Sequence, residues 1–144
     1  MKVIKIVLIA LVVYAGIVAA FESMIGYTQP TPESTVVITT FDADGTSHDR
    51  VVSRLESAGQ VYVAANHWPR AWYKRALANP KVQVTVDGQK VDFVAVPVTG
   101  AEHDRVAAEH PHAAWFRFVT GYPPRYFLRL DAPAGANPVA GNPG

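Results

Sequence analysis

The sequence predicts an α+β fold in which six antiparallel strands and short helices form a small barrel, preceded by one N-terminal transmembrane helix. Three observations support this prediction. An uncharged apolar run lies near the start of the chain, alternation with a period of two dominates the rest, and three short helical segments interrupt the strands without a strand–helix–strand repeat. The last pattern favours antiparallel pairing, because parallel strands need regular crossover helices.

Composition limits the domain count and the partners. The 144 residues suffice for one domain with a core. The formal net charge is only +1, so we expect no nucleic-acid partner. Cysteine is absent, which excludes disulfides and thiol nucleophiles, so any redox chemistry must come from a bound cofactor.

A membrane anchor is predicted over residues 1–24. Residues 6–21, IVLIALVVYAGIVAAF, carry no charge and, with the apolar residues before them, reach the roughly 17 residues that a bilayer-spanning helix needs. Two lysines precede the run and the next basic residue is Arg50, so the positive-inside rule places the N-terminus in the cytoplasm and the domain outside. The alternative is a secretory signal cleaved after the Val-Ala-Ala at 18–20, which would make the protein secreted.

Three further segments complete the chain. We expect a linker over residues 25–35, where two prolines favour an extended tether. The barrel domain follows over residues 36–131. Residues 132–144 are rich in Ala, Pro, Gly and Asn and cannot bury enough apolar surface to offset chain entropy, so we expect a disordered tail.

The elements of the barrel follow from alternation and from end signals. Strands are predicted over residues 36–41, 47–56, 60–66, 81–87, 91–98 and 125–130. Helices are predicted over residues 69–78, 99–110 and 111–120. Their end signals are a proline at a first-turn position, the capping-box spacing of Thr99 and Glu102, and a glycine after the last helix.

One stretch of the chain resembles a known family. Residues 66–84, NHWPRAWYKRALANPKVQV, are followed by a strand pair and then by VTGAEHDRV. The combination of W-Y, A-N-P and T-G-A-E in this register resembles the deazaflavin-dependent nitroreductase family, over residues 36–130.

The resemblance implies a split β-barrel that binds an 8-hydroxy-5-deazaflavin coenzyme, sometimes FMN, and passes a hydride to quinone-like or nitro acceptors. Two such barrels commonly pair as a homodimer. Some relatives bind haem or have no known activity, so a non-catalytic barrel that binds a small lipophilic or anionic ligand at the membrane surface is the second hypothesis. The predicted orientation favours this second hypothesis, because reduced deazaflavin is regenerated in the cytoplasm, whereas the motifs favour the first.

The start of the helix expected at residue 69 is a candidate anion site. The helix follows directly on a strand end, so its unpaired N–H groups point at whatever binds over Asn66 and His67. Arg70 lies in the first turn, where a helix normally prefers acids, and this indicates a ligand such as phosphate. Lys74 and Arg75 either add positive charge to this anion site or belong to a solvent-exposed face of the helix without a ligand.

The same segment supplies aromatic residues. Trp72 and Tyr73, with Ala76 and Leu77, form the side of the helix that we expect to pack on the barrel. Together with Trp68, the two aromatic residues complete the predicted cofactor-binding part of this segment.

A second basic group lies on the strand over residues 47–56. His48, Arg50 and Arg54 share one face, because side chains alternate along a strand, and we assign them to the same cofactor site. The alternative is an exposed face on which Glu56 pairs with these cations. The family usually has an arginine or lysine in place of His48, and a serine and a lysine at the end of the third strand.

Aromatic residues gather near the last predicted helix. Trp115, Phe116, Phe118 and Tyr122 are too close in sequence to face one core, and in the family this region forms a wall over the ring and the substrate. We expect core packing for Trp115 and Phe118, and a lid in contact with the substrate for Tyr122 and Tyr126.

No other group of residues in the sequence indicates a catalytic or metal site. His103, His110 and His112 lack carboxylate partners at ligand spacing, so we expect exposed histidines and no metal site. No catalytic side chain is predicted either, because an oxidoreductase of this type needs its protein to bind and orient the cofactor that carries the chemistry.

Overall fold

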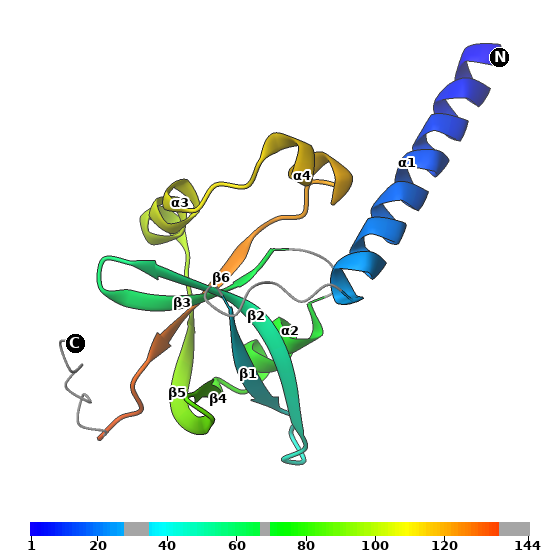
Figure 1. Cartoon of the computed structure of the whole chain (residues 1–144). Coiled ribbons are helices and arrows are strands. Elements are labelled where there is room, and N and C mark those ends of the chain that lie inside the picture. Colours follow the sequence, from blue (N-terminus) through cyan, green and yellow to red (C-terminus); the bar gives the residue numbers. More distant parts are fainter. Residues whose placement is uncertain (28–34, 67–69, 136–144) are drawn as a thin grey trace.

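The computed structural model describes residues 1–27, 35–66 and 70–135, which form a barrel with short helices around it and one long helix that projects away (Figure 1). In chain order the elements are α1 (Lys2–Tyr27), β1 (Thr35–Phe41), β2 (Ser47–Ser57), β3 (Gln60–Ala65), α2 (Ala71–Ala78), β4 (Lys81–Val86), β5 (Gln89–Pro97), α3 (Gly100–Glu109), α4 (Ala114–Val119) and β6 (Tyr126–Asp131).

The strands close into a barrel in the order β1-β2-β3-β6-β5-β4, and every neighbouring pair is antiparallel. Two of the hairpins use two-residue turns, Ala58-Gly59 and Asp87-Gly88, in which both residues have positive φ. Such turns match the right-handed twist of the strands that they join. The fold class predicted from the sequence is confirmed, although α4 begins at residue 114 and not at 111.

Two apolar cores hold the domain together. The interior of the barrel is filled by residues such as Ile38, Val63 and Leu128, and α2 covers it with Trp72 and Ala76. Leu77, which we expected on the packing side of α2, is exposed. The second core lies outside the barrel, where Val106 of α3 packs on residues of β3 and β6, namely Tyr62, Ala64 and Phe127. The strands of this region therefore bury both of their faces.

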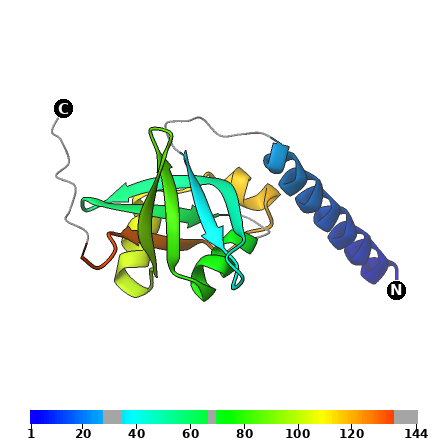
Figure 2. The same ribbon diagram turned by 90° about the horizontal axis from the view of Figure 1, so that it is seen from below.

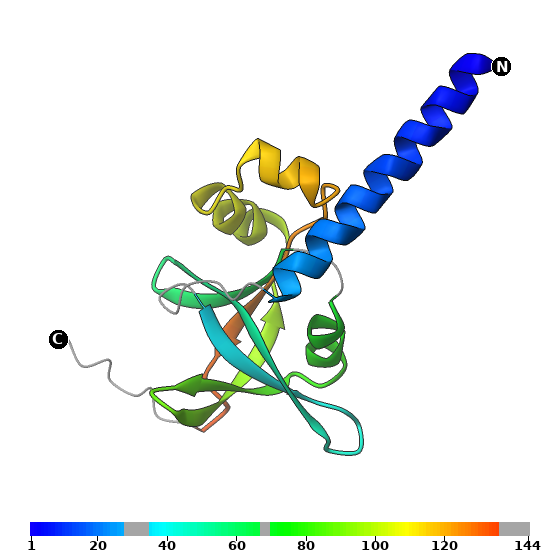
Figure 3. The same ribbon diagram turned by 45° about the vertical axis from the view of Figure 1, so that its right-hand side comes forward.

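The long helix α1 projects from the barrel, and its N-terminal part stands clear of the domain (Figure 2, Figure 3). Its segment Lys2–Met24 is long and apolar enough to cross a membrane, a description that a signal sequence also fits. The predicted boundaries of anchor, linker and tail stay predictions, because residues 28–34 and 136–144 lie outside the described residues.

Candidate functional site

A cavity of about 390 Å³ lies between the end of β3, the helices α3 and α4, and the segment before β6. Its volume falls in the range of ligand sites. It is lined by Asn66, His103, Ala107, Pro111, His112, Arg117, Thr120, Tyr122, Pro123, Pro124 and Arg125. Two arginines and two histidines belong to this wall, and none of the described residues in it is acidic. The wall therefore suits an anionic ligand.

Arg125 is the most constrained cation of the cavity. Its Nε donates to Asn66 Oδ1 at 3.0 Å, its Nη1 donates to the carbonyl of His110 at 2.7 Å, and its guanidinium lies 5.0 Å from the ring centroid of Phe127. The remaining nitrogen, Nη2, is buried and has no hydrogen-bond partner among the described residues. Burial, and secondly the charge of Arg117, lower the pKa of Arg125 from its usual value. A buried guanidinium nitrogen without a partner is costly, so an anionic ligand would stabilise it.

Tyr122 holds an unusual backbone conformation at the mouth of this cavity. Its φ of 52° is left-handed, which costs a bulky residue about 1–3 kcal/mol. The conformation is fixed by a hydrogen bond from the Tyr122 N–H to the carbonyl of Arg117 at 2.8 Å, and the Arg117 guanidinium lies 5.7 Å from the Tyr122 ring centroid. The tyrosine ring and the arginine are therefore positioned together.

The three histidines are half-buried and hydrogen-bonded or ring-packed, so our expectation that they are exposed was wrong. His103 Nε2 donates to the carbonyl of Arg125 at 2.9 Å, and His110 Nε2 donates to the carbonyl of Glu56 at 2.9 Å. The ring of His112 packs against Phe116 at 5.2 Å. In residues 1–27, 35–66 and 70–135 no group of three potential ligands is arranged to hold a metal ion.

An aromatic shelf borders the cavity. The rings of Tyr73 and Tyr126 stack at a centroid distance of 5.2 Å, and the guanidinium carbon of Arg70 lies 4.8 Å from the Tyr126 centroid. Arg70 Nη2 also donates to the carbonyl of Pro124 at 2.8 Å, and Pro124 belongs to the cavity wall. Burial raises the pKa of Tyr73, so its phenol stays neutral. The two rings and the Arg70 guanidinium thus form an aromatic edge to the cavity.

The cations of β2 make contacts elsewhere. His48 Nε2 donates to Asp42 Oδ2 at 2.6 Å, and Arg75, in the last turn of α2, contacts Asp42 Oδ1 at 3.2 Å. Arg54 pairs with Glu56, as the alternative to ligand binding anticipated. The described contacts thus connect His48 with the end of α2, whereas Arg70 lies at its start.

The other predicted site residues are scattered. Asn66 is part of the cavity wall, Trp72 is buried in the barrel core, and Arg50 and Lys74 are exposed. The predicted residues His67 and Trp68 lie outside the described residues.

Sequence reasoning missed the two arginines of the cavity. The closing of the barrel brings Arg125 to the end of β3, because Ala65 at the end of β3 pairs with Tyr126 at the start of β6, and Arg117 lies on α4 eight residues before Arg125. The available sequence signal was the position of Arg125 directly after two prolines and before a strand. The core packing expected for Trp115 was also wrong, because that side chain is 65% exposed.

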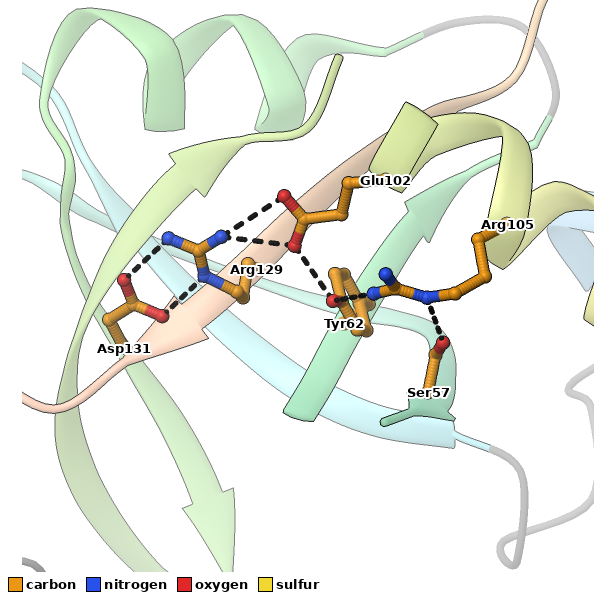
Figure 4. A network of polar contacts seen from close by, with 6 residues as sticks. All are labelled: Ser57, Tyr62, Glu102, Arg105, Arg129 and Asp131. Carbon is orange, nitrogen blue, oxygen red and sulfur yellow. Dashed lines mark hydrogen bonds and ion pairs between the residues drawn. The ribbon is translucent and has the colours of Figure 1, made fainter. Parts of the chain in front are cut away.

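A second polar cluster lies on the opposite edge of α3 and is fully paired (Figure 4). Arg129 binds both oxygens of Asp131, at 2.8 and 3.0 Å, and both oxygens of Glu102, at 3.0 and 3.1 Å. Glu102 Oε1 also accepts the hydroxyl of Tyr62 at 2.8 Å, and Arg105 donates to the same hydroxyl at 3.2 Å. The bond from Tyr62 and then the contact with Arg129 lower the pKa of Glu102. These contacts tie α3 to β3 and β6.

Solved structures share this fold at low sequence identity. A structure described as a domain-swapped dimer has a TM-score of 0.55 and 20% identity, covering 72% of this chain and 84% of that one. An F420-H2 dependent reductase, FDR-A, has a TM-score of 0.52 and 20% identity, covering 72% and 99%. The haem storage protein HutZ from Vibrio cholerae has a TM-score of 0.52 and 17% identity, covering 72% and 84%. No curated protein matches the chain in sequence.

The sequence itself matches one family model, described as F420H(2)-dependent quinone reductase, over residues 13–122. The match covers the end of α1, the barrel strands β1 to β5 and the helices that form the cavity. It agrees with the resemblance to deazaflavin-dependent enzymes seen in the sequence. The chain therefore belongs to the F420H2-dependent quinone reductase family.

Proposed function

We propose that this protein is a membrane-anchored oxidoreductase that binds the deazaflavin coenzyme F420 and reduces a quinone-like or nitro acceptor. The family supports a deazaflavin, and nothing in the comparisons supports FMN. The observation that carries the proposal is the acid-free cavity with the buried, unpartnered Nη2 of Arg125 in its wall. A coenzyme with a phosphate group fits such a site, because a charge-assisted hydrogen bond to that nitrogen would offset its burial.

The residues of the cavity would bind and orient the coenzyme. Arg117 and Arg125 would hold its anionic groups, and the amide of Asn66 would keep Arg125 in place. The shelf of Tyr73 and Tyr126 would stack on a flat ring beside the cavity. When bound, the reduced deazaflavin supplies a hydride, which with one proton from solvent converts a quinone to a hydroquinone.

The test is a titration of the purified full-length chain, in detergent, with F420 and separately with FMN, read by absorbance and fluorescence. We expect F420 to bind and its affinity to fall as salt is raised, because the contacts are between charges. Arg125→Gln, which removes the cation with the unpartnered Nη2, should weaken binding about tenfold to a hundredfold, the effect of losing a charge-assisted contact of about 1.5–3 kcal/mol. Lys81→Gln, which removes an exposed charge outside the cavity wall, is the matched control.

Two outcomes would contradict the proposal. If neither coenzyme binds a well-folded sample at high micromolar concentration, the oxidoreductase hypothesis fails and the ligand-binding barrel remains. If Lys81→Gln weakens binding as much as Arg125→Gln, the interaction is with the general charge of the protein and not with the cavity. Arg50→Ala reports whether the exposed cation of β2 belongs to the same site.

A further inference from the structure

The helix α4 and the turn that follows it expose large aromatic side chains. Trp115 is 65% exposed, Phe118 51% and Tyr122 55%, and we call these three residues the α4 aromatic face. Tryptophan and tyrosine are the residues most enriched where protein meets the boundary between lipid and water. Side chains of this size exposed on a short helix and on the turn after it indicate a partner.

The α4 aromatic face is continuous with the apolar helix α1. The ring of Tyr14 packs on Phe118 at 5.2 Å, and its hydroxyl donates to the Phe118 carbonyl at 2.9 Å. Phe21 packs on Phe116 at 6.0 Å. Figure 3 shows α4 beside the domain-side part of α1, with the rest of α1 pointing away. Anything that surrounds α1 therefore also meets α4.

The length of α1 decides what surrounds α4. At a rise of about 1.5 Å per residue, Tyr14 lies about 18 Å along the helix from Lys2. The hydrocarbon core of a bilayer is about 30 Å thick. The part of α1 that precedes its contacts with α4 is thus too short to span alone. A spanning α1 that keeps these contacts therefore brings α4 into the membrane, with the Tyr14–Phe118 contact inside the hydrocarbon core.

The backbone of α4 is suited to that environment, where unpaired carbonyl groups are costly. The carbonyls of Phe116, Arg117 and Phe118 in its last turn accept hydrogen bonds. The Thr120 N–H and hydroxyl donate to Phe116, the Tyr122 N–H donates to Arg117, and the Gly121 N–H and Tyr14 hydroxyl donate to Phe118.

We propose that the α4 aromatic face inserts into the lipid bilayer beside α1, so that the domain docks on the membrane with the Tyr122 side of its cavity next to lipid. The proposal rests on the anchoring of α1 suggested under the proposed function, and it is independent of which coenzyme binds.

The absence of cysteine makes a depth measurement direct. Single cysteines carrying an environment-sensitive fluorophore are introduced into the full chain, which is reconstituted in phosphatidylcholine vesicles with nitroxide quenchers on the lipids at shallow or deep positions. Phe118→Cys and, as a second reading, Trp115→Cys report on α4. Val12→Cys, at a position 72% exposed on α1, reports on the anchor, and Gln89→Cys in the β4–β5 hairpin is the water-exposed control.

We expect the labels at residues 118 and 115 to show blue-shifted emission and quenching by the lipid nitroxides. The label at residue 118 should lie at nearly the depth of residue 12, because Tyr14, two residues further along α1, contacts Phe118. The label at residue 12 should be quenched most by the deep nitroxide, and the label at residue 89 should not be quenched. Quenching at residue 12 without quenching at residues 115 and 118 would overturn the docking and leave the anchor. No quenching at any position would overturn both, while coenzyme binding in detergent would still stand.

Discussion

The two sides of α3 handle charge in opposite ways. On one side, Arg129 is enclosed by the carboxylates of Glu102 and Asp131, and the charges compensate each other (Figure 4). On the other side, the cavity holds Arg117 and Arg125 with no carboxylate in its described wall. The same helix thus borders a cluster in which Arg129 has two anions and Arg105 has two hydroxyl partners, and a cavity whose described wall supplies no anion to its cations.

The contrast separates structural from functional charge. A half-buried arginine with two carboxylates stabilises the fold through contacts that are already complete. A half-buried arginine whose pKa is lowered by burial and by a second arginine is maintained at a cost to stability, which indicates a ligand. Variants of the two clusters should therefore have opposite consequences for stability and for binding.

The largest effect on stability is expected for Arg129→Met. The substitution keeps the length of the side chain but leaves two carboxylates facing each other without their cation. We expect the free energy of unfolding, measured in urea, to fall by about 2–3 kcal/mol, as for the loss of charge-assisted hydrogen bonds. The affinity for F420 should not change beyond the loss of folded protein. Arg129→Lys keeps the charge and loses the bidentate geometry. Its free energy of unfolding should lie between those of the parent chain and Arg129→Met.

The same comparison explains how far the sequence could lead. Strand alternation and the turn at Asp87-Gly88 are local signals, and the fold class that they predicted is confirmed. The predicted anion site used cations that are close in sequence or share a strand face. The structure places His48 against Asp42 across the β1–β2 turn and pairs Arg54 with Glu56 on the same strand, so nearby carboxylates take up these cations.

The cavity could not be predicted, because its opposite walls are joined only by barrel closure. Arg125 reaches Asn66 across 59 residues of sequence, and no local pattern carries that distance. The exposure of Trp115 and Phe118 was missed for a different reason. Large apolar residues on a helix usually pack in a core, and the short helix α4 has no buried residue.

A smaller effect is expected from the titration of Glu102. Its pKa is lowered in the folded state by the Tyr62 hydroxyl and by Arg129, so its charged form contributes stability above the pKa of the unfolded chain. That contribution is lost as the pH falls through the folded-state pKa. We expect Glu102→Gln to be less stable than the parent chain near neutral pH and the difference to shrink under acidic conditions, as measured by urea unfolding at several pH values. A difference that stays constant with pH would contradict this role.

The smallest effect on stability is expected for Arg117→Gln, on the other side of the comparison. Arg117 is exposed, and its charge lowers the pKa of Arg125, so removing it relieves a repulsion between like charges. We expect the free energy of unfolding at low salt to stay constant or to rise by about 0.2–0.5 kcal/mol, the size of interactions between neighbouring surface charges. The affinity for F420 should nevertheless fall about tenfold, because a contact with an anionic group of the ligand is lost. Urea unfolding and the fluorescence titration, each run beside Lys81→Gln, measure the two quantities separately. If Arg117→Gln loses stability and keeps its affinity for F420, Arg117 is a structural cation like Arg129. That result would contradict the proposal that the cavity binds an anion through Arg117.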